Sequence, residues 1–161
     1  MFRTLAISIL TLLSPVLFSC EKAPEVSILD SPKEEQTENV TMPDRIKITI
    51  SGKTLPVKIE DNKATKALVA ALREATITYE ADDYGGFEKV GPLGRSLPTS
   101  NSQITTQAGD VILYSGNQIV LFYGSNSWSY TRIGKIEYGT NEELKSFLKA
   151  GQGKITVTLS L

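Results

Sequence analysis

The sequence has no histidine and one cysteine, Cys20, among its 161 residues. Histidine is the commonest general base in enzymes and the commonest ligand of transition metals, and cysteine thiolates are the other main ligands of zinc. A single cysteine also excludes an intramolecular disulfide. We therefore expect no metal, no cofactor, and no nucleophile activated by an imidazole or a thiolate in the folded part of the chain.

A strong excess of charge of either sign is missing too. The 17 lysines and arginines nearly balance 18 aspartates and glutamates, for a formal net charge of −1. No basic cluster stands out, so we do not expect the chain to bind nucleic acid. The glycines at 85–86 and 91–94 do not form a phosphate-binding loop, because no Lys-Ser or Lys-Thr pair follows them in a strand–helix setting.

The first 19 residues have the composition of a secretory signal, with Arg3 ahead of a short, mostly apolar run. The run ends in a Leu-Phe-Ser-Cys motif at Cys20, which resembles a bacterial lipobox. The resemblance implies that residues 1–19 are removed and that the Cys20 thiol is acylated, so membrane lipid is the first predicted partner. A plain cleaved signal, with Cys20 as an incidental thiol, is the alternative.

A transmembrane helix is disfavoured for the same segment. Ser8, Ser14 and Pro15 interrupt the apolar run, which is shorter than the ~20 residues that span a bilayer. The cysteine is followed by Glu21 rather than by aspartate, so the retention signal for the inner membrane of enteric bacteria is missing. We expect an anchor in the outer membrane of the cell envelope. The sequence leaves open whether the protein faces the periplasm or the exterior.

Residues 20–44 are rich in proline, glutamate, serine and threonine and poor in large apolar residues. Such a stretch cannot bury enough surface to fold, so we predict a flexible tether between the lipid and a domain at 45–161.

The domain has mostly the patterns of β-strands. Alternating isoleucines at 46–50, a Ser-Gly-Lys turn and a second alternating run predict a hairpin over 45–59. A helix is predicted at 63–74, capped by Asp61 or Asn62, and a second, short helix after the capping box that begins at Thr140. The further predicted strands are 76–79, 111–114, 118–123, 128–132, 133–138 and 155–161.

The total is a mainly β fold. About eight short strands with closely spaced turns favour a closed antiparallel barrel with two short helices over an open sheet. Residues 80–107 are rich in Asp, Gly, Pro, Ser and Asn and have little periodicity, which predicts a long loop. Loops of that length in a compact domain tend to be functional or disordered.

Several segments resemble the bacterial cyclophilin-like domain family. These are Gly86-Phe87-Glu88-Lys89, the Ala-Gly-Asp-Val-Ile-Leu-Tyr run at 108–114, and the Ser-Tyr-Thr-Arg-Ile-Gly run at 129–134. The resemblance covers 45–161 and implies a cyclophilin-like barrel whose ends are covered by helices. It does not imply prolyl isomerase activity, because the Phe-His-Arg context of classical cyclophilins is absent from a chain without histidine.

Two charged residues are candidates for ligand binding. Glu88 lies beside Gly85-Gly86 in the predicted loop and is either an acceptor at the mouth of the barrel or half of an ion pair with Arg95 or Arg132. Arg132 lies on a strand rich in apolar and aromatic residues. Its guanidinium either clamps a carboxylate or carbonyl group or lies over aromatic rings on the surface. Asp110 is expected to make a turn or to cap backbone amides, without a catalytic role.

Four aromatic residues complete the candidate set, namely Tyr114, Tyr123, Trp128 and Tyr130. Trp128 and Tyr130 share a face of a strand. Such rings are more often core than ligand platform, although a buried tyrosine hydroxyl usually needs a partner and one or two are expected to line an opening.

We predict a non-catalytic binding or interaction module for a peptide, a protein or a small molecule. A peptidyl-prolyl isomerase that uses Arg132 over an apolar pocket is the alternative, since isomerisation needs no covalent chemistry. A barrel that only supports a larger envelope assembly is the third possibility. No catalytic residue is assigned.

Overall fold

The computed structural model describes residues 41–161. The predicted signal peptide, the acylated Cys20 and most of the predicted tether lie outside the described residues. The described part contains nine strands and two helices, in the order β1 (Arg45–Ile50), β2 (Lys53–Ile59), α1 (Lys63–Glu74), β3 (Ile77–Tyr84), β4 (Glu88–Pro92), β5 (Ser102–Thr105), β6 (Asp110–Tyr114), β7 (Gln118–Phe122), β8 (Ser127–Ile136), α2 (Asn141–Phe147) and β9 (Ile155–Ser160).

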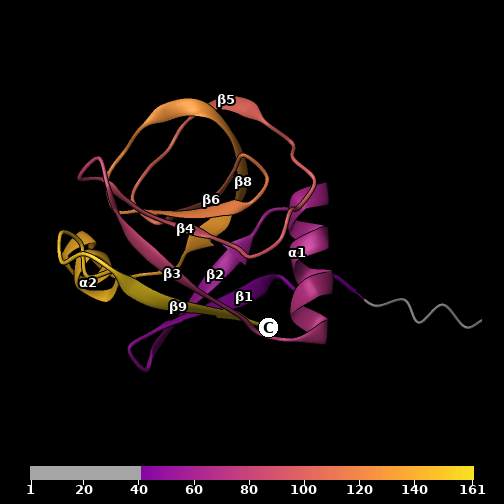
Figure 1. The fold of residues 1–161 in the computed structure, drawn as a ribbon, viewed down its shortest axis with the longest axis horizontal. Coiled ribbons are helices and arrows are strands. Elements are labelled where there is room, and N and C mark those ends of the chain that lie inside the picture. Colours follow the sequence, from indigo (N-terminus) through magenta and orange to yellow (C-terminus); the bar gives the residue numbers. More distant parts are fainter. Residues whose placement is uncertain (1–40) are drawn as a thin grey trace, which may run out of the picture. The chain divides into compact units, whose positions relative to one another are not determined.

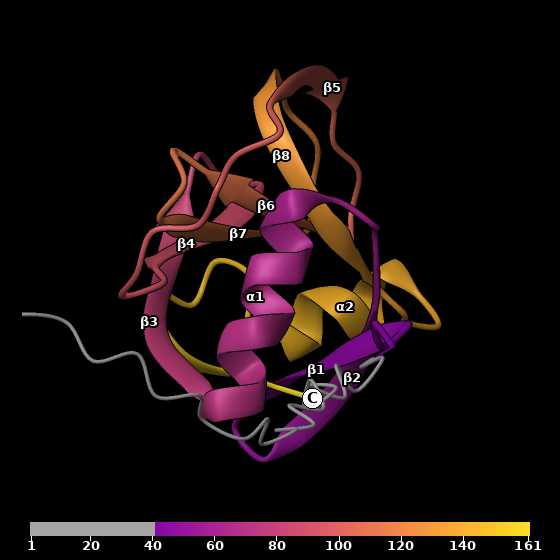
Figure 2. The same cartoon turned by 90° about the vertical axis from the view of Figure 1, so that its right-hand side faces the viewer.

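The strands form a closed antiparallel barrel, as predicted. They follow the order β2-β1-β9-β3-β4-β7-β6-β8, and β8 pairs with β2 to close the ring. The remaining strand, β5, pairs with the first half of β8 outside this ring. Figures 1 and 2 show the ring with α1 at one open end and α2 at the other.

The barrel is filled by one large apolar core. The alternating isoleucines of β1, at 46, 48 and 50, point into it and are at most 2% exposed. From the ends, Leu68 and Leu72 of α1 and Leu144 and Phe147 of α2 complete the same cluster. The hydrophobic periodicity of each element therefore matches the side that it buries.

Both helices begin at the predicted caps. Asn62 accepts hydrogen bonds at Oδ1 from the backbone N–H of Ala64 and of Thr65, each at 3.0 Å. Thr140 Oγ1 accepts from Glu143 N at 3.1 Å, and the Glu143 carboxylate reaches back to Gly139 N at 2.9 Å. The capping box thus forms with its return bond one residue earlier than usual.

Two glycines allow neighbouring strands to approach closely. A Cβ at Gly91 would collide with the carbonyl oxygen of Glu80, and one at Gly134 would collide with the carbonyl oxygen of Lys58. Gly134 lies opposite Ile59 on the seam where β8 and β2 close the ring. A side chain at either position would force the backbones apart.

The prediction of one long loop at 80–107 is wrong. β3 continues to Tyr84, β4 occupies 88–92, and β5 lies at 102–105. Hydrophobic alternation did not reveal β4, because its first two residues, Glu88 and Lys89, are charged and yet buried. The strands predicted at 128–132 and 133–138 are likewise one strand, β8, which continues through the expected break.

Candidate functional site

The barrel wall made by β4, β7 and β6 is buried on both faces. Val111, Leu113 and Leu121 point into the large core. Their neighbours along the strands, Ile112 and Phe122, point outward into a second apolar cluster. This smaller cluster is formed by Ile112, Val120, Phe122 and Tyr130, with Phe87, Val90 and Ile104 packed against it.

The outer cluster is buried because a two-stranded ribbon lies beside it. β5 pairs with the first half of β8, with Ile104 opposite Trp128 and Ser102 opposite Tyr130. The second half of β8 pairs with β6 and β2 in the barrel. Figure 2 shows this ribbon rising away from the ring at the top of the molecule.

A cavity of about 390 Å³ opens on this outer face. Its nine lining residues come from β3, β4, β6, β7, β8 and the turn before β8: Tyr84, Glu88, Val90, Tyr114, Gln118, Val120, Asn126, Trp128 and Tyr130. We call it the aromatic pocket. It brings together four of the six predicted ligand-binding residues.

The aromatic rings of the pocket are partly fixed and partly free. Tyr130 is 5% exposed and packs edge-to-face on Tyr114 and on Phe122, with ring centroids 6.0 and 5.9 Å apart. Its hydroxyl accepts a hydrogen bond of 3.0 Å from Asn126 Nδ2. Trp128, by contrast, is 56% exposed at the rim. The pocket therefore has a rigid aromatic base and an accessible aromatic edge.

Glu88 is the one charged residue among the pocket's described lining. The residue is 5% exposed, and its Oε2 atom has no hydrogen-bond partner among the described residues. Burial raises the pKa of this carboxyl to about 7. A buried carboxyl oxygen without a partner is costly to the fold, and a group that binds a ligand is one physical explanation for it.

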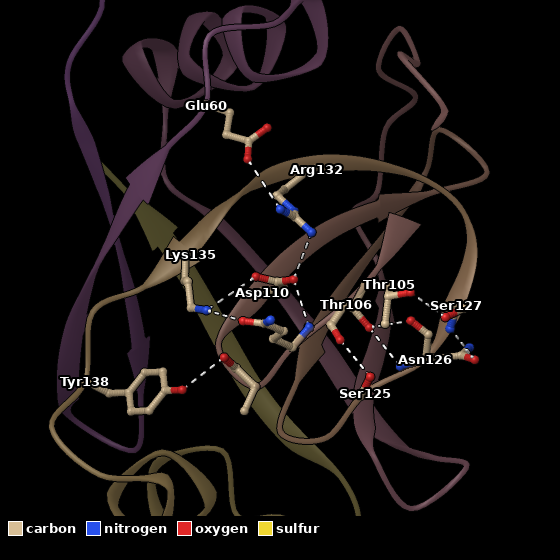
Figure 3. A network of polar contacts seen from close by, with 12 residues as sticks. Glu60, Thr105, Thr106, Asp110, Ser125, Asn126, Ser127, Arg132, Lys135 and Tyr138 are labelled. Atoms are coloured by element: carbon tan, nitrogen blue, oxygen red, sulfur yellow. Dashed lines mark hydrogen bonds and ion pairs between the residues drawn. The ribbon is translucent and has the colours of Figure 1, made fainter. Parts of the chain in front are cut away.

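The expected ion pair of Glu88 with Arg95 or Arg132 is not formed. Arg132 lies in a different cavity, of about 350 Å³, together with Asp110 and Lys135. Its Nη2 is 3.2 Å from Asp110 Oδ2, and its Nη1 is 3.8 Å from Glu60 Oε1 (Figure 3). Arg132 thus does not cover the aromatic rings, and two carboxylates approach its Nη atoms, whereas its buried Nε has no hydrogen-bond partner among the described residues.

Asp110 has the turn-forming role that its sequence context predicts. Its Oδ2 accepts a hydrogen bond of 2.9 Å from Gln107 N, while Arg132 and Lys135 approach the same carboxylate. Figure 3 shows that this polar network joins the start of β6 to β8. Its charges are matched internally, so we read it as structural.

Tyr123 also lies away from the aromatic pocket. It is 7% exposed in the large core, and its hydroxyl donates a 3.0 Å hydrogen bond to Asp83 Oδ1. Burial and the neighbouring carboxylate raise its pKa to about 12. The strand pleat explains this placement, because Phe122 faces outward and its neighbour Tyr123 must face inward.

Lys89 follows Glu88 on β4 and points to the inner face of the strand, towards the Asp83 carboxylate. Its Nζ is 2.8 Å from Asp83 Oδ2 and also donates to the Gly153 carbonyl. Asp83 further accepts from Gly153 N at 2.8 Å and Gly151 N at 3.1 Å. Burial alone would raise the Asp83 pKa, but these hydrogen bonds outweigh it and lower the pKa to about 2.

Sequence reasoning missed five residues that line the pocket: Tyr84, Val90, Gln118, Val120 and Asn126. Tyr84 and Glu88 lie opposite each other across the Gly85–Gly86 turn. Both glycines have positive φ angles, 61° and 77°. A Gly-Gly pair is a known signal for a two-residue hairpin loop, which would pair Tyr84 with Phe87. The observed loop also includes Phe87, so the signal indicates the hairpin but not its Tyr84–Glu88 register.

Within 41–161 no group of three or more aspartate, glutamate, histidine or cysteine residues could hold a metal ion. In the same part of the chain, no helix is long and apolar enough to cross a membrane. The aromatic pocket offers a ligand three kinds of contact: aromatic ring faces, the amide side chains of Gln118 and Asn126, and the Glu88 carboxyl group.

A ring of eight antiparallel strands with a helix at each end is the architecture that the sequence resemblance implied. Residues 48–160 match the model of the Cyclophilin-like family, and the chain belongs to this family. The solution structure of a hypothetical protein from Archaeoglobus fulgidus is similar, with a TM-score of 0.50 and 18% identity over 72% of this chain and 92% of that chain. No curated protein matches the chain. An identity this low shows a shared fold and leaves function to the site.

Proposed function

We propose that this barrel is a non-catalytic binding module and that the aromatic pocket is its ligand site. The observation that carries the proposal is the buried Glu88 carboxyl in a cavity lined by four aromatic rings, whose Oε2 has no hydrogen-bond partner in residues 41–161. A ligand that supplies the missing partner recovers the cost of burying that group. The volume of about 390 Å³ suits a small molecule or one side chain of a peptide.

The chain carries its own reporter for this proposal. Trp128 is the single tryptophan of the sequence and lies at the rim of the aromatic pocket. Its fluorescence therefore responds to occupancy of the pocket without interference from other tryptophans. A screen of small molecules and short peptides should give saturable changes in this fluorescence, accompanied by a rise in melting temperature.

A control separates pocket binding from binding elsewhere. In Trp128→Phe the fluorescence response is lost, while the ligand-induced rise in melting temperature falls but remains measurable. Ligands that raise the melting temperature and leave Trp128 fluorescence unchanged would place the site outside the pocket. A screen without any saturable response would remove the proposal.

We propose further that the module is anchored by acylated Cys20 in the outer membrane of the cell envelope. This rests on the Leu-Phe-Ser-Cys motif and on Glu21 after it. Mass spectrometry of the mature amino terminus should find a lipid-modified Cys20 as the first residue. An unmodified thiol at that position contradicts the anchor without affecting the pocket.

Prolyl isomerase activity is the alternative suggested by the fold, and the geometry does not favour it. That mechanism requires Arg132 over an apolar pocket, whereas Asp110 and Glu60 hold Arg132 in the other cavity. We expect cis/trans exchange in a proline peptide to proceed at the same rate with and without the protein. Accelerated exchange that Glu88→Gln abolishes would make the pocket an active site.

A further inference from the structure

We propose that the aromatic pocket binds an ammonium cation, with Glu88 as the counter-ion and the aromatic rings as the surrounding wall. This deepens the binding function proposed above and depends on it. The relevant ligands are a lysine side chain, a small alkylamine or a quaternary ammonium group. The combination of ring faces and one carboxylate is the chemistry that recognises such groups.

The carboxylate lies where a bound cation would need it. Glu88 is the first residue of β4, opposite Tyr84 on β3 and opposite Phe122 on β7. It therefore lies between two aromatic residues on the outward face of the wall. Its buried Oε2 has no hydrogen-bond partner among residues 41–161, so the carboxyl group keeps unused capacity for one further strong interaction.

The rings form a corner rather than a flat stack. Tyr114 and Tyr130 meet at an interplanar angle of 70°, with centroids 6.0 Å apart. Trp128, from the same strand as Tyr130, extends the wall at the solvent side. A cation is attracted by aromatic faces within about 6 Å of a ring centroid, so a group in this corner can reach more than one ring.

No positive charge already satisfies the site. The nine described lining residues include no lysine or arginine. The other polar and aromatic residues that line the pocket with Glu88 carry no formal charge: tyrosines from β3, β6 and β8, Trp128, Gln118 and Asn126. Lys89 points to the opposite face of β4, where Asp83 holds it.

An ionised Glu88 disfavours an anionic ligand, because two like charges would share one largely buried site. A neutral carbonyl ligand is the competing occupant, since a protonated Glu88 can donate a hydrogen bond. The two occupants require opposite protonation states of one residue. Their pH dependences therefore have opposite signs.

The test compares choline with its neutral isostere, in which a tert-butyl group replaces the trimethylammonium group. Choline keeps its charge at every pH, so any pH dependence of its binding belongs to the protein. We expect choline to bind at least about tenfold more tightly than the isostere at about pH 8, measured by Trp128 fluorescence and calorimetry. Since the Glu88 pKa is about 7, choline affinity should fall about tenfold from about pH 8 to about pH 6.

Glu88→Gln keeps the shape of the site and removes its charge. It should lower choline affinity about tenfold at about pH 8 and abolish the pH dependence. Glu80→Gln is the matched control, because Glu80 is an exposed carboxylate of β3 that pairs with Lys154 outside the pocket. A capped lysine amide in the same assay tells whether a lysine side chain or a quaternary ammonium group fits better.

The outcomes distinguish the two proposals. If the neutral isostere binds as tightly as choline, or if affinity rises as the pH falls, the pocket binds a neutral acceptor and the cation assignment is wrong. If no ammonium probe binds while another ligand quenches Trp128, the binding function stands and the cation assignment falls. If no compound of either kind changes Trp128 fluorescence, both fail.

Discussion

Glu88 and Lys89 are neighbours on β4, but they differ in the face to which they point and in the partners of their charged groups. Lys89 is fully buried on the inner face and is held by the Asp83 carboxylate and the Gly153 carbonyl. Glu88 is nearly as buried on the outer face, and its Oε2 has no partner among the described residues. One pleat of one strand thus separates a matched charge from an unmatched one.

The difference teaches where stability and function lie in this wall. Around Asp83, every charged group has partners, so the inner network fastens β4 to the chain segment before β9. Around Glu88, the fold bears the cost of an unsatisfied carboxyl. Removing a charge should therefore destabilise the inner site and stabilise the outer one.

Lys89→Met should have the largest effect. It removes the buried ammonium and leaves Asp83 with backbone and tyrosine donors alone, so the free energy of unfolding should fall by about 3 kcal/mol. Urea unfolding followed by circular dichroism measures this loss. A loss below about 1 kcal/mol would mean that the inner network is not a structural fastening.

Glu88→Gln should act in the opposite direction and depend on pH. The folded-state pKa of Glu88 is about 7 against an ordinary value of 4.5, so the folded state binds more protons between these values. Wild-type stability relative to the variant is then highest below about pH 4.5 and is lost as the pH rises to about 7, by up to about 3 kcal/mol in total. Urea unfolding of both proteins over this range gives the difference, and a flat difference contradicts the unpaired state of Glu88.

Asp83 provides the opposite slope in a separate pH window. Its pKa is lowered to about 2, so its stabilisation is complete above the ordinary value of 3.8 and is lost as the pH falls towards 2. Asp83→Asn should therefore remove part of the acid sensitivity below about pH 4 and leave the Glu88 window unchanged. Acid titrations of Asp83→Asn and Glu88→Gln side by side check that the two carboxyls act independently.

Tyr123→Phe tests a single bond of the inner network. The variant loses the hydroxyl that donates to Asp83 and keeps the ring in the core. The other donors to Asp83 remain, so the expected loss is about 1 kcal/mol in urea unfolding. An unchanged free energy of unfolding would show that the hydrogen bond from the Tyr123 hydroxyl to Asp83 does not stabilise the fold.

Lys154→Met should have the smallest effect and serves as the control for Lys89→Met. Lys154 pairs with Glu80 at 3.2 Å, but the two side chains are 60% and 65% exposed. An exposed pair contributes little, so the free energy of unfolding should change by less than about 0.5 kcal/mol. An effect equal to that of Lys89→Met would show that burial does not decide the difference between these two lysines.

Most of the fold was predictable because local patterns agree with the final structure. The isoleucine alternation of β1, the Asn62 cap and the capping box at Thr140 each specify their element without tertiary information. β4 was missed because Glu88 and Lys89 break the apolar pattern. Only tertiary partners make a buried charge acceptable, and these partners lie far away in the sequence.

The candidate site was predictable in composition and less so in geometry. Trp128 and Tyr130 share a strand face, which the pleat alone predicts, and both line the pocket. That Tyr114 and Glu88 join them depends on the register of β4, β7 and β6, which no local pattern contains. Arg132 lines the other cavity instead, because it pairs with Asp110 where β8 runs antiparallel to β6.

The ten-residue β8 takes part in two hydrogen-bonding systems, and its two halves need not open together. Among the described strands, β5 pairs with β8 alone, so releasing β5 breaks no ladder of the closed ring. Amide hydrogen exchange should therefore be fast in β5 and in the first half of β8 and slow in β6 and β7. The ribbon of β5 and the first half of β8 can therefore open locally while the barrel stays folded. A bound molecule can enter and leave the aromatic pocket through such local opening.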